Sequence, residues 1–368
     1  MLLIIMMTAL GVDTAVADAA VTKTAFGKLP EGTTAEIYTL KNEEIEVRIT
    51  NYGARIVAIE TKDRDGKMGD VVLGYDTVEG YVAEEASKTY VGAIVGRYGN
   101  RIRNGKFTID GHEYQIPLNN GANALHGGPH GFDDQIWAVK ELADGVEMSL
   151  VSKDGDMGFP GTLTLHVRYT LEGSALHINY AATTDKTTVV NVTNHAYFNL
   201  AGDGSGPILP EVMQINADEY TPVDAGLIPV GGAKPVAGTP FDFNKPTVIG
   251  ARINEANEQL KFGGGYDHNW ILRGKPGEMK VAARVYDPKS GRVLTESTTE
   301  PGVQFYSGNA IPGLYKGKTG VVYGKYAGFC LETQHYPDSP NQPEFPSTLL
   351  KPGVTLRSET VYAFSVQK

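Results

Sequence analysis

The stretch GTLTLHVRYTL (161–171), followed closely by LHINYAAT (176–183), decides the fold class. Apolar and β-branched residues alternate with polar ones in both runs, so one face of each is apolar and the other polar. This period of two is typical of half-buried β-strands, because successive side chains of a strand point to opposite faces of its sheet. The two runs predict neighbouring strands.

The same pattern recurs from about residue 36 to the C-terminus, in short runs separated by Gly, Asn and Asp. In KFTIDGHEYQI (106–116), Asp110-Gly111 indicates a tight hairpin, because both central turn positions require positive φ. Helical candidates are few and short, namely 80–87 and 253–260. Many short strands with turns between them predict an all-β sandwich or barrel and exclude repeated βαβ units. Further strands are expected at 44–50, 54–61, 70–75, 187–195, 280–287, 292–298, 302–308 and 354–366.

Composition and charge restrict the class of ligand. The formal net charge is −10, and the 33 Lys and Arg residues are scattered without forming a basic stripe. Nucleic acids and anionic membrane surfaces are therefore poor partners, and a neutral ligand is favoured. The sequence contains no Walker loop, no G-x-S-x-G elbow and no G-x-G-x-x-G between a strand and a helix.

The N-terminus predicts an exported protein. The apolar run MLLIIMMTALGV precedes small residues, and both Ala15-Val16-Ala17 and Ala17-Asp18-Ala19 fit a signal-peptidase site. No Lys or Arg precedes the run, so a cytoplasmic protein with a non-functional leader stays the alternative. We expect a signal peptide over 1–19 and a single β-sandwich domain over 20–368. The one cysteine, Cys330, cannot form an internal disulfide.

Two residues are candidates for acid–base chemistry. In AGFCLETQ (327–334), strand alternation places Glu332 on the less apolar face of an otherwise hydrophobic strand, where burial would raise its proton affinity. His195 ends TTVVNVTNH, and the same alternation groups it with Asn191 and Thr193. A histidine exchanges protons near neutral pH. A structural carboxylate and a hydrogen-bonded core histidine are the alternatives.

Other polar residues suit sugar hydroxyls. Asn100 and Arg101 place an amide beside a forked donor, and Asp267 can accept from two hydroxyls. His126 and His130 lie four apart in a Gly/Pro loop that cannot be a helix, so a hydrogen bond from His126 to a ligand is favoured over zinc. We predict no metal.

Seven segments, in order along the chain, together resemble the aldose 1-epimerase (galactose mutarotase) family. They are NYGARIVAI (51–59), GRYGNRI (96–102), LHGG (125–128), TNHAYFNL (193–200), YDHNW (266–270), GVQFYSGN (302–309) and GFCLETQHYPDSPN (328–341). The resemblance implies a large antiparallel β-sandwich, a supersandwich, and an enzyme that needs no cofactor.

The resemblance also implies roles for individual residues. Glu332 would be the general base and His195 the general acid in opening and reclosing the ring of a free sugar. The expected sugar contacts are Asn100, Arg101, His126, Asp267 and Gln304. The expected partner is a small neutral monosaccharide such as glucose or galactose. A monomer is the default, with a dimer left open.

Three other functions fit parts of this pattern. A carbohydrate-binding or sensor domain would use the same polar and aromatic lining without an acid–base pair. A glycoside hydrolase would need two carboxylates facing one bond, and Asp267 could partner Glu332. A sugar-phosphate epimerase would need a clustered basic pocket, for which only Arg101 is a clear candidate.

Overall fold

The computed structural model describes residues 19–368. The leader expected over 1–19 lies outside the described residues except for Ala19, and export stays a prediction. Within the described part of the chain, neither helix has the length and apolar composition needed to cross a bilayer.

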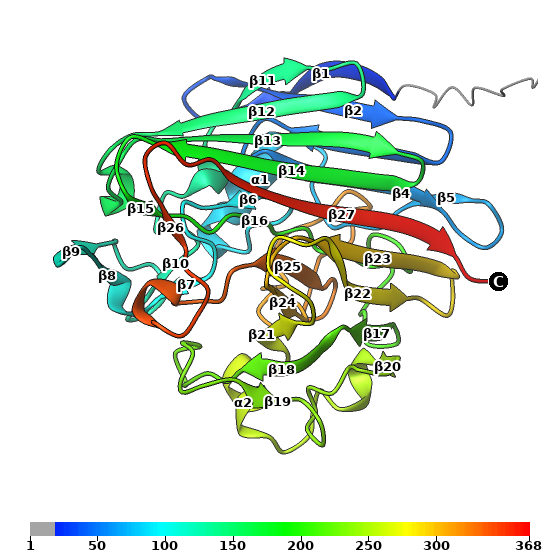
Figure 1. Cartoon of the computed structure of the whole chain (residues 1–368). Helices are drawn as coiled ribbons and strands as arrows, with labels where there is room; N and C mark the ends of the chain where they lie inside the picture. Colours follow the sequence, from blue (N-terminus) through cyan, green and yellow to red (C-terminus); the bar gives the residue numbers. More distant parts are fainter. Residues whose placement is uncertain (1–18) are drawn as a thin grey trace, which may run out of the picture.

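Three antiparallel sheets account for most of the regular structure (Figure 1). The first contains β1 (Ala20–Lys28), β2 (Thr34–Lys41), β3 (Ile45–Thr50), β4 (Arg55–Lys62) and β5 (Met68–Asp70). The nine-stranded second sheet contains, in spatial order, β11 (Ala138–Glu141), β12 (Gly145–Ser152), β13 (Leu163–Glu172), β14 (Ala175–Thr184), β27 (Leu356–Val366), β23 (Arg292–Thr298), β22 (Lys280–Tyr286), β17 (Val212–Ile215) and β20 (Thr247–Val248). The third contains β19 (Lys234–Pro235), β18 (Ala217–Thr221), β21 (Asp267–Leu272), β24 (Gly302–Tyr306) and β25 (Cys330–Gln334).

Short ladders and two helices complete the structure. The two-stranded ladders pair β7 (Arg101–Ile102) with β10 (Ala124–Leu125), β6 (Ile94–Val95) with β16 (Thr193–Asn194), β15 (Thr188–Val189) with β26 (Leu349–Leu350), and β8 (Lys106–Ile109) with β9 (His112–Gln115). The helices are α1 (Val78–Glu84) and α2 (Glu258–Gly263). The predicted hairpin is confirmed: Asp110 and Gly111 join β8 to β9 with φ of 50° and 80°.

The strand that the alternation predicts best is β13. Its side chains alternate between buried and more exposed from Leu163 onward, with Leu165, Val167 and Tyr169 buried. In β25, by contrast, all five residues are buried, because this strand lies inside the molecule with both faces covered. One face carries Thr333, which contacts Thr360 of β27 with 2.5 Å between the two Oγ1 atoms. The other face carries Glu332.

The core is continuous across all three sheets. Val47 of β3, Val167 of β13 and Phe305 of β24 are fully buried members of one cluster. Each such side chain contributes about 1.5–3 kcal/mol through removal from water. The all-β antiparallel class is confirmed, and the assignment of 20–368 to one domain stays a prediction.

Three of the predicted elements differ from the structure. The helix expected over 253–260 begins only at Glu258, because the Asn257 side chain accepts from the backbone N–H groups of Gln259 and Leu260 and thereby caps it. The strand expected over 187–195 is broken into β15 and β16. In the run 70–75, Asp70 ends β5, and the chain beyond it is extended and forms only an isolated bridge, between Val72 and Phe198. In the last two, side chains on both sides of the chain are buried, so the local pattern does not reveal where pairing stops.

A buried acid in the core predicts pH-dependent stability. Glu296 of β23 is fully buried, and neither carboxyl oxygen has a hydrogen-bond partner among residues 19–368. Burial, and secondarily the charge of Glu332, raises the pKa of Glu296 well above 4.5. Because the unfolded chain releases this proton at lower pH than the folded one, Glu296 costs stability progressively as pH rises above about 4.5.

Glu296→Met is therefore expected to stabilise the protein by about 1–3 kcal/mol at pH 8, and by less at pH 5. Urea unfolding at both pH values measures this. Glu141→Met, which removes an exposed carboxylate from β11, serves as the control for the same substitution at the surface. A gain at pH 5 that equals the gain at pH 8 would contradict the assignment.

Candidate active site

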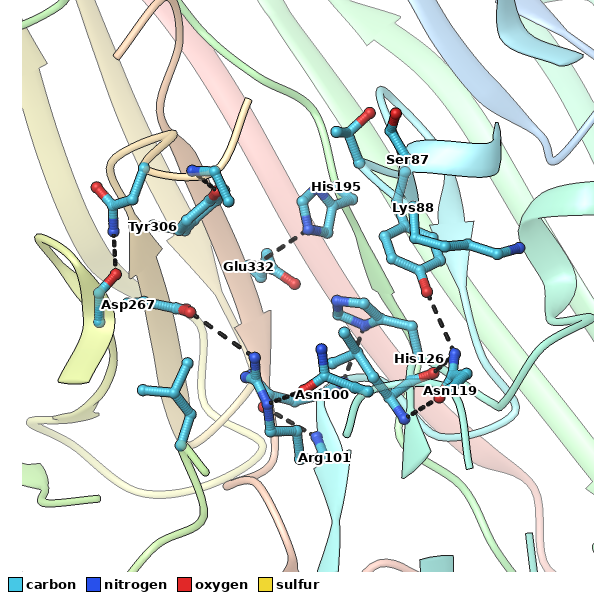
Figure 2. A pocket seen from close by; sticks show the side chains of 18 of the residues that line it. Ser87, Lys88, Asn100, Arg101, Asn119, His126, His195, Asp267, Tyr306 and Glu332 are labelled. Atoms are coloured by element: carbon cyan, nitrogen blue, oxygen red, sulfur yellow. Dashed lines mark hydrogen bonds and ion pairs between the residues drawn. The ribbon is translucent and has the colours of Figure 1, made fainter. Parts of the chain in front are cut away.

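A cavity of about 450 Å³ brings together residues from distant parts of the chain (Figure 2). Its wall is formed by the segment after α1, the β7–β10 ladder, the end of β16, and strands β21, β24 and β25. The lining residues are Ala86, Ser87, Lys88, Thr89, Tyr90, Asn100, Arg101, Asn119, Asn120, Leu125, His126, His195, Tyr197, Leu227, Gly263, Asp267, Tyr306, Asn309, Ala310 and Glu332. Every site residue expected from the sequence except Gln304 is among them.

Glu332, on β25, lines this cavity. It pairs with Gln304 across the β24–β25 ladder, and its side chain is 3% exposed. Its Oε2 atom has no hydrogen-bond partner in the part of the chain that the structure describes. Burial raises the pKa of Glu332 well above 4.5; the nearby Asp267 adds to this, and Arg101 opposes it. The carboxylate expected from strand alternation is thus confirmed as a buried group with high proton affinity.

His195 faces Glu332 from the other side. It follows β16, where its backbone N–H donates to the carbonyl of Ala93 at 2.8 Å. Its Nε2 atom lies 3.7 Å from Glu332 Oε1, and Figure 2 shows the two side chains pointing toward each other. Burial is the main cause that lowers the pKa of His195 to about 4, with a backbone hydrogen bond opposing it and Arg55 lowering it further.

The opposite ring nitrogen of His195 contacts a thiol. Nδ1 lies 3.5 Å from Cys330 Sγ. Burial raises the pKa of this thiol well above 9.0, so it stays protonated. With the thiol as donor, the neutral imidazole carries its own proton on Nε2, the atom that faces Glu332.

His126 is fixed as a hydrogen-bond donor toward the cavity. The backbone N–H of Asn100 donates to its Nδ1 at 3.0 Å. Burial, with smaller contributions from His195 and Arg101, lowers the pKa of His126 well below 6.5. The neutral ring must therefore hold its proton on Nε2. Tyr90 contacts this ring edge to face, with 4.6 Å between the centroids.

Arg101 and Asp267 form a polar pair at another wall. Arg101 Nη2 lies 4.0 Å from Asp267 Oδ2, and Arg101 Nε donates to Asn120 Oδ1 at 3.1 Å. Asn100 precedes this arginine with φ of 64°, and its Oδ1 accepts from the Arg101 backbone N–H. These contacts hold a forked donor and a carboxylate in fixed positions, as recognition of adjacent hydroxyls requires.

Gln304 lies behind this wall and does not line the cavity. Its Nε2 donates to Asp267 Oδ1 at 2.7 Å. Gln304 therefore orients the Asp267 carboxylate, a role that the sequence pattern of β24 does not distinguish from direct contact with a sugar.

The cavity also contains three groups of the kind that bind metals. Ligand atoms of His126, His195 and Glu332 lie within 4.8 Å of one another. A histidine that ligates a metal through Nε2 normally carries a proton on Nδ1 and donates it to an acceptor. Nδ1 of His126 instead accepts from Asn100, so a metal on Nε2 would place two donors against each other. The arrangement does not fit a metal ion. His130, the other histidine of the loop, is exposed and contacts Asp134.

Several lining residues carry no signal in the sequence. The segment 86–90 follows α1 and contributes Ser87, Lys88 and Tyr90, but the sequence predicts only the end of a helix at residues 86 and 87 and no element over 88–90. Asn119 and Asn120 belong to an ordinary turn sequence, Asn-Asn-Gly. Asn119 fixes the strand that precedes His126, since it both accepts from and donates to the backbone of Leu125.

A family model described as aldose 1-epimerase matches residues 36–363. The chain belongs to the aldose 1-epimerase family. The resemblance seen in the seven segments is thereby confirmed, and with it a place among carbohydrate epimerases.

Related sequences and solved structures are similar to this chain over nearly its whole length. Galactose mutarotase of Bos taurus is 49% identical over 94% of this chain and 99% of its own length. Aldose 1-epimerase of Escherichia coli is 40% identical over 91% of this chain and 96% of its own. The crystal structure of galactose 1-epimerase from Lactobacillus acidophilus superposes with a TM-score of 0.81 at 30% identity, covering 95% of this chain and all of that one. The supersandwich expectation is confirmed.

Proposed function

We propose that this enzyme interconverts the α and β anomers of free aldoses such as glucose and galactose, with Glu332 as general base and His195 as general acid. The observation that carries the proposal is their convergence. The two residues come from distant parts of the sequence, yet their side chains face each other at 3.7 Å in one buried cavity lined by hydrogen-bonding groups.

The reaction follows from the chemistry of a hemiacetal. Glu332 removes the proton from the anomeric hydroxyl, while His195 gives a proton to the ring oxygen. The bond between the anomeric carbon and the ring oxygen breaks, which leaves an open-chain aldehyde. Rotation about the adjacent carbon–carbon bond presents the other face of the carbonyl group. Reclosure uses the same two groups in the opposite sense, so both return to their starting protonation states.

Burial acts on both groups in the direction that strengthens this chemistry. A raised pKa makes the Glu332 carboxylate a stronger base, and a lowered pKa makes the protonated His195 a stronger acid. The same burial favours the uncharged pair in the free enzyme, with the proton on Glu332. A bound sugar offers a hydroxyl donor to the carboxylate and a ring oxygen to the imidazolium, and both contacts favour the reactive ion pair.

The cavity lining supports a neutral sugar over a sugar phosphate. His126 offers a donor from Nε2, and Asp267 offers carboxylate oxygens beside the fork of Arg101. Among the lining residues only Lys88 and Arg101 are cationic, and Arg101 is already paired with Asp267. A phosphate would need a denser cluster of such donors.

Polarimetry tests the proposal. Freshly dissolved α-galactose and α-glucose should reach anomeric equilibrium much faster with the enzyme than without it. An unchanged spontaneous rate, with binding retained, would identify a sugar-binding protein instead. Release of the aglycone from an aryl glycoside would identify a hydrolase.

Arg101→Lys tests the proposed sugar contacts. Lysine keeps the charge but loses the fork that spans Asn120 and Asp267. Hydrogen bonds to charged groups contribute about 1.5–3 kcal/mol, so KM should rise by about 10–100-fold. We expect a much smaller change in kcat, because the acid–base pair is untouched. Equal losses in kcat and kcat/KM would assign Arg101 to the transition state instead.

We also propose that residues 1–19 direct export. The apolar run and the small residues that follow support this, and the missing Lys or Arg opposes it. Intact-mass measurement on protein from fractionated cells tests it: a cleaved periplasmic or secreted form is expected, and an uncleaved cytoplasmic form would contradict it.

A monomer is our proposal for the assembly state. One chain supplies every residue that lines the cavity, so catalysis requires no second copy. Light scattering of the purified enzyme tests this proposal, and a dimer that persists at nanomolar concentration would overturn it.

A further inference from the structure

Three further polar side chains lie on the same face of the third sheet as Glu332. Residues paired across an antiparallel ladder share a face, and here Asn269, Gln304 and Glu332 are paired in sequence across β21, β24 and β25. Gln334, two residues after Glu332, shares this face as well. Asn269, Gln304 and Gln334 are no more than 3% exposed, and none of them lines the sugar cavity. We call these three residues the amide layer.

The amide layer is almost without hydrogen bonds inside the protein. Neither side-chain polar atom of Asn269 has a partner among residues 19–368, and the same is true of Gln334. Gln304 uses its Nε2 for Asp267 and leaves Oε1 unpartnered. Glu332 Oε2 also has no hydrogen-bond partner among these residues. Buried polar groups are nearly always satisfied, so this concentration of free donors and acceptors indicates a ligand of its own.

Local backbone geometry leaves room for this layer. Gly302 pairs with Gln334 on one side and with Ile271 on the other, and the Asn269 side chain lies close to it. A β-carbon at Gly302 would lie 2.5 Å from Asn269 Oδ1 and 3.0 Å from the ring of Tyr336. Only glycine therefore admits the Asn269 side chain in this position.

The chemistry of the unpartnered atoms identifies the ligand. The layer presents amide oxygens and a carboxylate oxygen, which need donors, beside amide N–H groups, which need acceptors. Water is the small molecule that both donates and accepts, and buried water typically makes about three such bonds. We propose that Asn269, Gln304 and Gln334 hold ordered water against Glu332 Oε2 and thereby act as positioning residues for the base.

This inference rests on the role proposed for Glu332 and deepens it. Water that donates to Oε2 fixes the plane of the carboxylate and leaves Oε1 free to face His195 and the sugar. It also stabilises the ionised carboxylate against the full effect of burial. Without the layer, the base would ionise at higher pH and would rotate out of its productive orientation.

Two variants of nearly unchanged volume test the layer, Gln334→Met and Asn269→Leu. Each is expected to lower kcat by about 10–100-fold with KM changed by less than threefold. In each, one limb of the pH–rate profile should move to higher pH. Gln334→Asn, which keeps an amide, should recover part of the loss. Thr333→Val is the matched control: it lies between Glu332 and Gln334 but on the opposite face, so it should lower stability without moving the profile.

Loss of rate at every pH without movement of the profile would show a merely structural role and overturn the proposal. A crystal structure of the wild-type enzyme tests the proposed water site independently of activity. Water within hydrogen-bond distance of Glu332 Oε2 and of at least one amide is expected, whereas amides that bond directly to Glu332 would overturn the proposal. If the wild-type enzyme fails to accelerate anomerisation, the proposed function is wrong. The crystal structure would still show whether the amide layer holds water against Glu332.

Discussion

Glu332→Gln is expected to lower kcat for anomerisation by about 10²–10⁴-fold, the usual contribution of a general base. Glutamine has nearly the same shape and keeps an oxygen in the cavity, but it cannot take the proton of the anomeric hydroxyl. Sugar binding should change little, because the contacts assigned to Arg101, His126 and Asp267 remain. Polarimetry at saturating galactose gives kcat, and isothermal titration calorimetry gives the affinity.

Glu359→Gln provides the matched control for this variant. Glu359 lies on β27, accepts from His177 at 2.8 Å and does not line the cavity. The Glu359→Gln variant should retain the wild-type kcat. Near-normal turnover in Glu332→Gln would refute the role of base, and loss of binding together with turnover would indicate that Glu332 mainly holds the sugar.

The fold class could be predicted because local pattern and tertiary burial agree in the long strands. In β13 the alternation of the sequence is the alternation of burial. This agreement ends where both faces of a segment are covered. Around His195, buried residues occur on every side of the chain, and the expected strand is two short ladders. The position of His195 is set instead by its backbone bond to Ala93, a long-range contact that no local pattern encodes.

The site residues could be named from motifs, but the contacts among them could not be predicted. Strand alternation placed Glu332 on the correct face of β25 and predicted the direction of its pKa. It did not show that Gln304 orients Asp267 from behind the wall. Strand alternation tells on which face of a sheet a side chain lies, but not whether that side chain reaches the cavity or only contacts a residue that does. The contributions of Lys88, Asn119 and Asn120 depend on how separate loops meet, and their residue types are common in loops generally.

The form of the acid–base pair is likewise a property of the folded state. The sequence predicts a raised pKa for Glu332 but assigns His195 no shift from its ordinary value near neutral pH. Their shared burial shifts the two pKa values in opposite directions. The proton that one group loses is therefore readily held by the other, and the two should behave as one unit.

His195→Asn tests whether Glu332 and His195 act as one unit. Asparagine offers a hydrogen-bond donor but no transferable proton, so kcat should again fall by about 10²–10⁴-fold with binding retained. The informative comparison is the double variant with Glu332→Gln, measured by the same polarimetric assay. If one proton circulates between the two groups, removing the second after the first costs little, and the double variant should be about as slow as the slower single one. Losses that multiply would mean that base and acid act independently. The 3.7 Å separation between His195 Nε2 and Glu332 Oε1 would then have no catalytic consequence.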